Sequence, residues 1–337
     1  MSQQHYRISL DAMSGDLGPA AVVPAALDAL KTFADIELVL VGDEAEIRRH
    51  LGNAAVERVE IVHTTEVVTM EDAPAQALRM KKDSSMRVAI NLVKDGAVDA
   101  AVSAGNTGAL MATAKFVLKT LPGIHRPAIC TAVPSGRGGH THILDLGANI
   151  DSSPEQLYQF AVMGSEMVQA VDANPSPTVG LLNVGAEAIK GSAEVKAAGE
   201  LLSDSPLNYI GFVEGDDIYA GKVDVVVCDG FVGNVALKTS EGLAKMISNN
   251  LRDEFLRTPL TKLAGVIAMP VLRAFRRKID PRRYNGASLL GLSGVVIKSH
   301  GGADRLAFAN AIKIARIEAH QKVPEKIGAQ IRQLLAE

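Results

Sequence analysis

The sequence predicts an α/β protein built on a mostly parallel, doubly wound sheet, and three observations support this fold class. Short apolar runs alternate with helical patterns along nearly the whole chain. Six of these runs end in a turn of Gly, Asn or Asp residues and then open into a helical pattern. The composition is that of an ordinary soluble α/β protein, with 47% hydrophobic and 22% charged residues. Such alternation predicts a mostly parallel sheet that helices cover on both faces.

Local patterns in the first half of the chain place its strands and helices. Apolar runs predict strands over residues 6–10, 36–41, 59–62, 100–103, 128–133 and 142–146. Helical spacing predicts helices over residues 19–31, 44–50, 71–83, 85–94 and 107–118. Asp43 is placed to cap the second of these helices, because its carboxylate can accept from first-turn N–H groups.

The second half repeats the pattern. It predicts strands over residues 178–182, 209–213 and 223–227, and helices over residues 154–171, 193–201, 235–250, 303–320 and 324–335. Neither an internal repeat nor a low-complexity linker interrupts it. We therefore expect one catalytic domain over residues 1–337, with a soft subdivision near residue 175, where the polar turn is longest.

The composition of the chain argues against several classes of protein. The net charge of −3 over 337 residues argues against nucleic acid as the main partner. Cys130 and Cys228 both lie in apolar runs, so we expect buried thiols in a reducing compartment and no structural zinc site. No apolar stretch resembles a signal peptide or is long enough to span a bilayer, so a cytoplasmic protein is expected.

The six turns cover residues 11–16, 103–108, 145–149, 183–187, 214–217 and 229–234. Parallel strands would gather them along one edge of the sheet, beyond the strand C-termini, where open α/β proteins bind ligands. Glycine lets backbone N–H groups approach a ligand, and helix N-termini carry partial positive charge. The pattern therefore predicts a cleft for an anionic group, with phosphate as the favoured ligand.

The turn over residues 229–234 carries the strongest single signal. Gly230 and Gly233 permit a tight turn, and Asn234 can either cap the following helix or donate its amide to a carbonyl or phosphate oxygen. Lys238 follows on the same helical face. In a second loop, Lys190 beside Gly191 can reach an anion as a point charge. A solvated surface lysine is the more common case, but the neighbouring ligand-type turns favour a functional role.

Two further motifs complete the predicted cleft. The turn holding Ser103, Gly105, Asn106 and Thr107 lacks the ending of a P-loop and the dinucleotide fingerprint. His300 precedes a helix and is a candidate donor or base, or part of a local cap. The candidate phosphate- or substrate-binding residues are Asp11, Ser103, Gly105, Asn106, Thr107, Asn149, Asp229, Gly230, Gly233, Lys238 and His300.

Four carboxylates complicate a phosphate site, because Asp11, Asp16, Asp145 and Asp229 would repel an anion unless they are paired or turned away. They either cap helices, pin loops and pair with lysines, or two or three of them hold Mg²⁺. We expect no cofactor and keep Mg²⁺ as the alternative. A covalent acyl-enzyme is disfavoured, because no nucleophile elbow occurs and neither cysteine lies in an activating turn.

Residues 255–283 break the alternation. An apolar stretch over residues 263–272 is flanked by nine basic residues: Arg252, Arg257, Lys262, Arg273, Arg276, Arg277, Lys278, Arg282 and Arg283. Pro259 can start a helix and Pro270 should end or kink one, which predicts a protruding hairpin of two short helices over residues 252–285 with an apolar tip. Insertion into an anionic membrane surface, packing at a subunit interface and docking of an acidic partner all fit. The candidate contact residues are Leu263, Val266, Ile267, Met269, Arg273, Arg276 and Arg277.

Seven segments, taken in order, resemble the phosphate acyltransferase family of bacterial phospholipid synthesis. They are DAMSGD (11–16), SAGNTGAL (103–110), LDLGAN (144–149), GLLNVGAEAIKG (180–191), GFVEGDDI (211–218), VVVCDGFVGNVALK (225–238) and SHGGAD (299–304). Two positions depart from the expected pattern, namely Ser14 in place of Gly and Ala186 in place of Glu. Both are small enough for the loops to close, whereas a polar role at position 186 is in doubt.

The resemblance implies a phosphotransacylase or isocitrate-dehydrogenase-like fold and a reaction between long-chain acyl-carrier protein and inorganic phosphate. The acyl phosphate would feed a membrane enzyme that acylates glycerol 3-phosphate. A homodimer, peripheral association with the inner face of the cell membrane, and catalytic roles for Lys190 and Asn234 are implied as well. The first rival is a short-chain phosphate acyltransferase that uses acyl-CoA. A metal- and NAD-dependent decarboxylating dehydrogenase and a non-catalytic membrane scaffold are the others.

Overall fold

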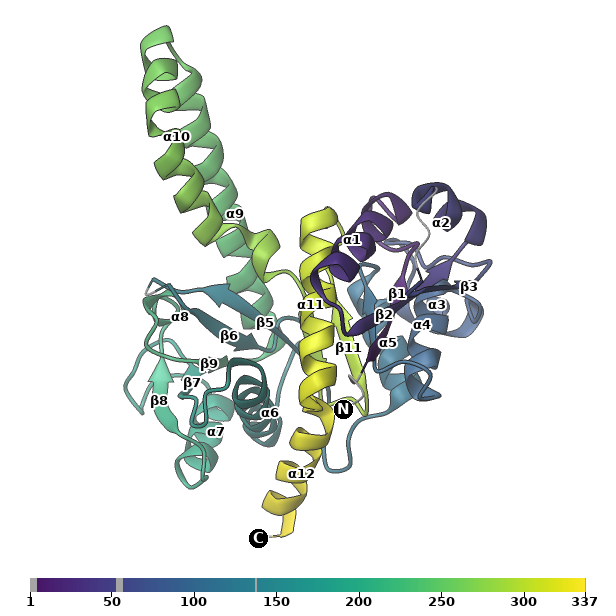
Figure 1. Ribbon diagram of the computed structural model, residues 1–337. Helices are drawn as coiled ribbons and strands as arrows, with labels where there is room; N and C mark the ends of the chain where they lie inside the picture. Colours follow the sequence, from purple (N-terminus) through teal and green to yellow (C-terminus); the bar gives the residue numbers. More distant parts are fainter. Residues whose placement is uncertain (1–4, 53–56, 137, 337) are drawn as a thin grey trace.

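The computed structural model describes residues 5–52, 57–136 and 138–336. Its centre is an 11-stranded sheet in the order β3-β2-β1-β4-β11-β10-β5-β6-β9-β7-β8 (Figure 1). The strands are β1 (Tyr6–Asp11), β2 (Ile36–Gly42), β3 (Val59–His63), β4 (Ala100–Ser103), β5 (Ala128–Pro134), β6 (His140–Leu144), β7 (Val179–Leu182), β8 (Tyr209–Val213), β9 (Val225–Val227), β10 (Ala287–Leu290) and β11 (Val295–Lys298).

Helices cover both faces of this sheet, as predicted. They are α1 (Pro19–Thr32), α2 (Glu44–Leu51), α3 (Pro74–Met80), α4 (Ser85–Lys94), α5 (Thr107–Leu118), α6 (Pro154–Asp172), α7 (Ala193–Ser203), α8 (Asp217–Ala220), α9 (Gly230–Leu256), α10 (Pro259–Ile279), α11 (Arg305–Gln321) and α12 (Val323–Ala336), with a 3₁₀ turn η1 (Pro281–Tyr284). On β2, Leu38 and Leu40 belong to the core under α1 and α11, whereas Val39 and Val41 face α4. This alternation is how a strand buries both of its faces.

Most predicted elements are confirmed to within a few residues, but one helix is much shorter than predicted, one strand is displaced by two residues, and two strands were not predicted. The helix expected over residues 71–83 is only α3, because Pro74 opens it and Lys81 leaves the helical conformation. The strand expected over residues 142–146 is β6, which begins two residues earlier, at His140, and ends at Leu144. Strands β10 and β11 have no counterpart among the predicted elements.

The sheet reverses its direction between β5 and β6, whereas the unforeseen β10 is a single antiparallel strand between β11 and β5. β11 runs parallel to β4, but β10 is antiparallel to both β11 and β5, and β6 is antiparallel to β5. Consequently β6, β7, β8 and β9 run opposite to β1 and β4. The turns after β1 and β4 lie at one edge of the sheet, which we call the first edge, and those after β6, β7, β8 and β9 lie at the other, the second edge. The expectation that all six turns share one edge is therefore wrong.

Two large cores lie on the same face of the sheet, on either side of its centre. Phe308 of α11 is fully buried in the core formed with α1, and Phe160 of α6 is fully buried in the core of the opposite half. Cys130 and Cys228 are free and buried, as predicted. Both halves thus contribute strands to one continuous sheet.

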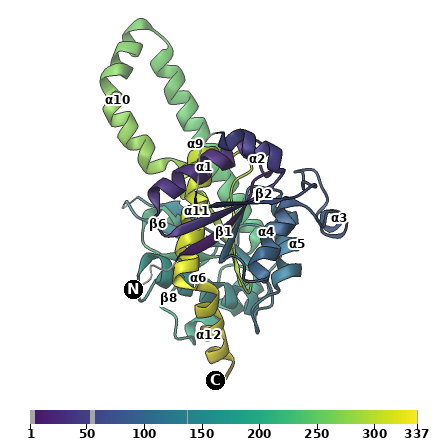
Figure 2. The ribbon, with the colours of Figure 1, turned by 45° about the vertical axis from the view of Figure 1, so that its right-hand side comes forward.

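The second half of α9 and the whole of α10 form the protruding hairpin (Figures 1 and 2). Thr258 caps α10 through Thr261, and Pro259 is its first residue, as predicted. Pro270, however, lies inside a continuous α10, so the predicted helix end is wrong. The apolar stretch 263–272 therefore lies along α10 instead of at the tip. A Cβ on Gly265 would be 3.1 Å from Cδ1 of Phe255, so packing against α9 supports α10 against the cost of an internal proline.

None of the described helices combines the length and the apolar composition that crossing a bilayer requires.

Candidate functional site

Asp145 organises the loop after β6 at the second edge. The carboxylate is fully buried, and its Oδ1 accepts from the backbone N–H groups of Ile129 (2.9 Å) and Ala148 (3.1 Å). Its Oδ2 accepts from the backbone N–H of Asn149 (2.7 Å) and from the Asn149 amide (2.9 Å). Burial raises the pKa of Asp145 despite these hydrogen bonds. Asp145 and Asn149 therefore pin a loop, and the Asn149 amide, which also donates to Pro127 O, is used internally.

Gly230 and Gly233 let the first turn of α9 approach this loop. A Cβ on Gly230 would lie 2.3 Å from the carbonyl oxygen of Asn149, and one on Gly233 would lie 1.9 Å from the carbonyl oxygen of Asp145. Neither glycine has a positive φ, so the tight-turn explanation is wrong and close packing of a helix on a loop replaces it. Asp229 accepts from Val232 N–H (2.9 Å) and is the helix cap.

Gly233→Ala should destabilise the protein by about 1–3 kcal/mol, because the new methyl group meets a backbone oxygen that cannot rotate away. Gly242→Ala is the matched control on the same helix, since no atom lies within 4 Å of its Cβ position. That change should stabilise α9 by up to about 1 kcal/mol. Urea unfolding of both variants checks the prediction, and equal stability of the two would contradict it.

Asn234 is a polar residue at the second edge whose side chain is available for hydrogen bonding. It lies in the second turn of α9, beside Gly147, whose Cβ position is 3.5 Å from Asn234 Cγ. Because Asp229 caps the helix, the capping role considered for Asn234 is excluded. The Asn234 side chain is exposed and makes no hydrogen bond within the described ranges, so its amide is free to donate to a ligand oxygen.

The loop that carries Lys190 follows β7, the neighbour of β9. Asn183 shapes it by donating to the carbonyl oxygens of Gly185 (3.2 Å) and Lys190 (3.1 Å). Gly191 has φ 95° and closes the loop on Asn183. Lys190 Nζ pairs with Glu187 Oε2 at 2.9 Å, and this pair raises the pKa of Lys190. The exposed Lys190 ammonium thus lies at the same edge as Asn234. It is paired with the Glu187 carboxylate, which a bound anion could replace.

The first edge holds a second polar cluster, at the ends of β1 and β4. Asp11 is buried and accepts from Ser103 Oγ at 2.6 Å, while its Oδ1 has no partner in the described chain. Burial raises the pKa of Asp11. Ser14 donates to Asp11 O (2.8 Å) and accepts from Ala104 N–H (2.8 Å), so the serine that departs from the family pattern bridges the two turns.

The turn before α5 uses most of its polar groups internally. Asn106 caps α5 by accepting from Ala109 N–H (3.1 Å), and its amide donates to Met70 O (2.8 Å). Gly105 lies against Met86, whose Cε would be 2.5 Å from an added Cβ. Thr107 is exposed at the first position of α5, and it remains available to a ligand.

Lys298, the last residue of β11, belongs to this cluster and was not predicted. Burial lowers its pKa to about 8, Lys238 acts in the same direction, and Asp11 and Asp16 oppose them. A lysine that ends an apolar strand and precedes the SHGGAD segment was the available sequence signal. Lys238 of α9, a helix that starts at the second edge, is therefore near enough to Lys298 at the first edge to lower its pKa.

His300 offers a hydrogen-bond donor at the first edge. Its Nδ1 accepts from Gly302 N–H at 3.0 Å, which places the proton of the neutral ring on Nε2. The ring is exposed, while the backbone N–H of His300 donates to Asn285 Oδ1 (2.9 Å). The local-cap and donor interpretations of this residue are therefore compatible.

The four aspartates do not converge. Asp11 and Asp16 act on Lys298 at the first edge, whereas Asp145 and Asp229 lie at the second. Among the described residues, one group of three metal-ligand side chains comes together, and it consists of His140, His142 and Asp172. Three of the four aspartates therefore do not meet at one site, and Mg²⁺ held by two of them stays a prediction. Burial raises the pKa of both cysteine thiols, which makes them poor nucleophiles.

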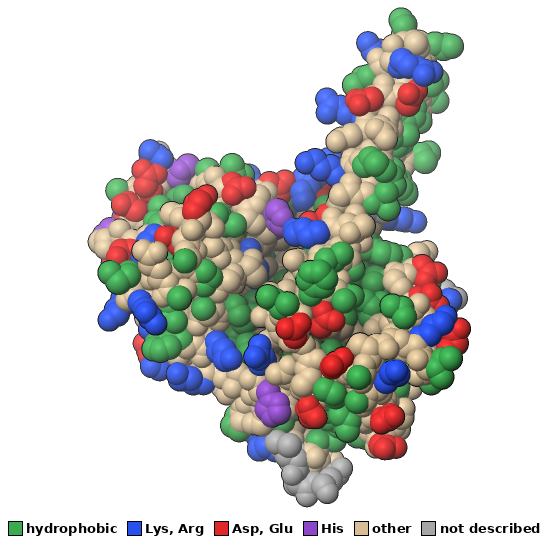
Figure 3. All heavy atoms as spheres, turned by 180° about the vertical axis from the view of Figure 1, so that it is seen from behind, with side chains coloured by type: hydrophobic (Ala, Val, Ile, Leu, Met, Phe, Trp, Pro, Cys, Tyr) green, Lys and Arg blue, Asp and Glu red, His purple; other side chains and the backbone are tan. Residues whose placement is uncertain are grey.

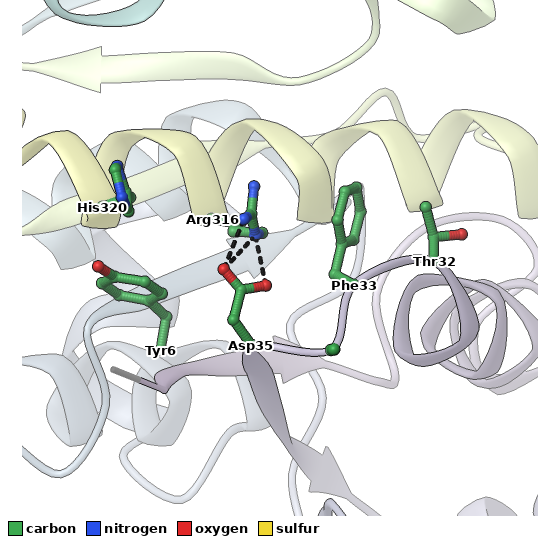
Figure 4. A pocket seen from close by; sticks show the side chains of 7 residues that line it. Tyr6, Thr32, Phe33, Asp35, Arg316 and His320 are labelled. Atoms are coloured by element: carbon green, nitrogen blue, oxygen red, sulfur yellow. Dashed lines mark hydrogen bonds and ion pairs between the residues drawn. The ribbon is translucent and has the colours of Figure 1, made fainter. Parts of the chain in front are cut away.

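A hollow of about 470 Å³ lies near Tyr6, at the opposite end of β1 from Asp11 (Figure 4). Arg316 of α11 pairs with Asp35 at its centre, and the rings of Tyr6 and His320 meet edge to face. Its charges are already paired with each other, and none of the predicted site residues lines it. This hollow is consequently separate from the candidate site.

The protruding hairpin exposes large apolar side chains. Leu263, Val266 and Ile267 are 58%, 67% and 74% exposed, and Met269 is 39% exposed. Figure 3 shows apolar side chains along one side of the hairpin and Lys and Arg along the other. The predicted contact residues Arg273, Arg276 and Arg277 are exposed on α10 as well.

Comparisons with known proteins agree on the family. The model of the fatty acid synthesis protein family matches residues 6–326. The phosphate acyltransferase of Methylococcus capsulatus is 63% identical over 332 residues, covering 98% of this chain and 98% of that protein. The phosphate acyltransferase of Nitrosococcus oceani is 60% identical over 334 residues, again covering 98% of each chain.

Solved structures share the fold. A phosphotransacetylase from Streptococcus pyogenes superposes with a TM-score of 0.62 at 19% identity, covering 94% of each chain. A branched-chain phosphotransacylase from Enterococcus faecalis gives a TM-score of 0.58 at 13% identity, covering 94% of this chain and 99% of its own. The predicted phosphotransacylase-like fold is confirmed. The chain therefore belongs to the fatty acid synthesis protein family, whose relatives are named phosphate acyltransferases, and it is an acyltransferase.

Proposed function

We propose that this enzyme transfers a long-chain fatty acyl group from acyl-carrier protein to inorganic phosphate. The observation that carries the proposal is the free Asn234 amide at the same sheet edge as the exposed Lys190 ammonium. Asn234 lies on α9, which follows β9, and Lys190 lies on the loop that follows the neighbouring strand β7. One group can donate to a carbonyl oxygen and the other can attract an oxyanion. The full-length similarity to phosphate acyltransferases supports this chemistry.

The reaction is a direct displacement. A phosphate oxygen attacks the thioester carbonyl carbon, a C–O bond forms, the C–S bond breaks, and the carrier thiol leaves with a proton. Lys190 holds the phosphate, and Asn234 donates to the oxyanion that develops on the carbonyl oxygen. Because phosphate needs only to be positioned in line with the carbonyl, much of the rate comes from orientation. The acyl phosphate would be consumed by a membrane enzyme that acylates glycerol 3-phosphate.

The donor thioester distinguishes this proposal from short-chain transfer by acyl-CoA. Initial rates with acyl-carrier protein and acyl-CoA of matched chain length, each with and without phosphate, test it. We expect phosphate-dependent cleavage that is faster with the long-chain carrier-protein thioester. Faster turnover of a short acyl-CoA would favour the alternative, and absence of phosphate-dependent cleavage would exclude both.

We further propose that the hairpin places the enzyme on an anionic membrane surface as part of a cytoplasmic homodimer. Leu260, Leu263, Ile267 and Val271 recur at helical spacing on α10 and are 77%, 58%, 74% and 71% exposed. An exposed apolar stripe flanked by basic side chains is typical of helices that lie in the membrane interface. The same stripe could bury against a second copy, so the test includes the oligomeric state.

Leu263→Glu and Ile267→Glu should lower binding to vesicles of anionic phospholipid at least about tenfold while leaving solution activity and size unchanged. Met80→Glu is the matched control, because Met80 is 70% exposed on α3, away from the hairpin. Vesicle sedimentation and light scattering measure the two properties. A change from dimer to monomer, with vesicle binding retained, would assign the stripe to the subunit interface.

A further inference from the structure

His140, His142 and Asp172 form a cluster that the proposed acyl transfer does not use. His140 and His142 are the first and third residues of β6, so their side chains leave the strand on the same face, toward α6. Asp172 is the last residue of α6. Asp172 Oδ2 lies 2.8 Å from His140 Nε2 and 2.9 Å from His142 Nε2, and the three ligand atoms lie within 4.8 Å of one another.

The surroundings of this cluster favour a cation. The C-terminus of α6 carries partial negative charge, and it ends at Asp172. Asp224 adds a second negative charge that acts on His140, and Lys313 is the positive group that opposes it. Burial raises the pKa of Asp172, but the contacts with His140 and His142 outweigh it and keep the carboxyl ionised at neutral pH.

Access to the cluster is one-sided. The His142 side chain is 8% exposed, whereas those of His140 and Asp172 are 36% and 26% exposed. The buried imidazole forms the floor, and the other two groups form a rim that opens to solvent. An ion could therefore enter from solvent and keep a water molecule on its open side, as three-ligand zinc sites do.

We propose that His140 Nε2, His142 Nε2 and the Asp172 carboxylate bind a divalent transition-metal ion of the zinc class. Zinc bonds to His nitrogen and carboxylate oxygen at about 2.0–2.2 Å, so tetrahedral ligands stand roughly 3.3 Å apart. The present contacts of Asp172 with the two rings, 2.8 and 2.9 Å, would open by about 0.5 Å, and the two Nε2 atoms, which lie within 4.8 Å of each other, would come to the same separation. Each ring would carry its proton on Nδ1, which leaves both Nε2 lone pairs for the metal.

Such an ion would fasten the start of β6 to the end of α6. The predicted catalytic residue Asn234 lies at the second edge, beyond the other end of β6, so the metal has no place in the acyl-transfer chemistry. Two imidazoles suit zinc, copper and nickel, whereas Mg²⁺ prefers an all-oxygen environment. A bound ion is thus expected to raise the stability of the folded chain, and the site is expected to bind zinc in preference to Mg²⁺.

Calorimetric titration of the full chain without a polyhistidine tag, after dialysis against chelator, tests the proposal with ZnCl₂ and MgCl₂. We expect one zinc per chain, a higher Tm with zinc, and neither effect with Mg²⁺. His140→Ala should weaken zinc binding at least about tenfold, and the double change His142→Ala with Asp172→Asn should abolish it. His50→Gln, a histidine on α2 in the other half of the sheet, is the matched control and should bind normally.

Because a variant that fails to fold would also lose zinc binding, Co²⁺ binding to the unaltered protein provides a second test. Co²⁺ should bind with equal stoichiometry, give the visible absorption of a four-coordinate ion, and be displaced by zinc. Absence of zinc and cobalt binding by the unaltered chain would overturn the proposal. So would zinc binding that is unchanged in a folded double variant, because the ion would then have other ligands.

Discussion

Asn234→Ala lowers kcat of phosphate-dependent thioester cleavage by about 10²–10³, because it removes one hydrogen bond to the developing oxyanion. In the structure this amide is exposed on α9 and makes no hydrogen bond within the described chain, so the change should leave stability nearly unaltered. Asn250→Ala makes the same substitution at another exposed position of α9 and should leave kcat unchanged. Steady-state rates with acyl-carrier-protein thioester, together with urea unfolding, separate a catalytic effect from a structural one.

The companion change Lys190→Ala should raise KM for phosphate and also lower kcat, since the ammonium would both hold the anion and orient it. Lys94→Ala, at an exposed position of α4, is the matched control. The assignment of both residues fails if the two site variants keep near-normal phosphate-dependent activity. Acylation of an enzyme side chain during turnover would contradict the direct displacement itself.

Glu318→Gln should make the protein more stable at pH 8 and remove part of its pH dependence. Glu318 lies on the core face of α11, is 3% exposed, and accepts from Ser288 Oγ on β10. Burial raises its pKa from the ordinary value for glutamate, about 4.5, to about 7. The folded chain therefore keeps this proton between about pH 4.5 and 7, whereas the unfolded chain releases it.

The difference between the folded and unfolded pKa of Glu318 determines how stability changes with pH. Below about pH 4.5 both states are protonated and the group contributes its full stability, which is then lost as the pH rises through 7. The loss amounts to about 3 kcal/mol, because each pKa unit corresponds to about 1.4 kcal/mol. Glu318→Gln should abolish this fall in the free energy of unfolding between pH 5 and 8, as measured by urea unfolding.

A control at an exposed carboxylate tests whether burial is the cause. Glu200→Gln, on α7, should reproduce the pH dependence of the unaltered protein. Parallel stability curves for Glu318→Gln and the unaltered protein would show that the buried carboxyl does not titrate as described.

Local sequence was sufficient for most of the elements. The helices over residues 85–94 and 107–118 and the strand over residues 100–103 have the predicted bounds, and Asp43 caps α2 as expected. These features depend on hydrophobic spacing and on capping side chains, which act within a few residues. The family resemblance likewise depends on short Gly- and Asp-containing segments, and the comparisons with known proteins confirmed it.

The candidate site was only partly accessible from sequence. Asp229 and Asn234 were singled out together, but sequence could not decide which of them caps α9. Lys298 ends an apolar run, but its burial beside Asp11 depends on residues distant in sequence, so its position in the chain alone could not place it in the first-edge cluster. The sequence suggested that Gly230 and Gly233 permit a tight turn. In the structure they instead allow α9 to pack closely against the loop after β6.

By itself, the amino-acid sequence determined the α/β class, the capped helices, the family and the apolar, basic character of residues 255–283. Tertiary structure alone decided that the sheet reverses between β5 and β6, that the turns divide between two edges, and that α10 continues through Pro270. The physical reason is that strand pairing and helix packing depend on partners distant in sequence. Short apolar segments accept either strand direction until those partners are in place.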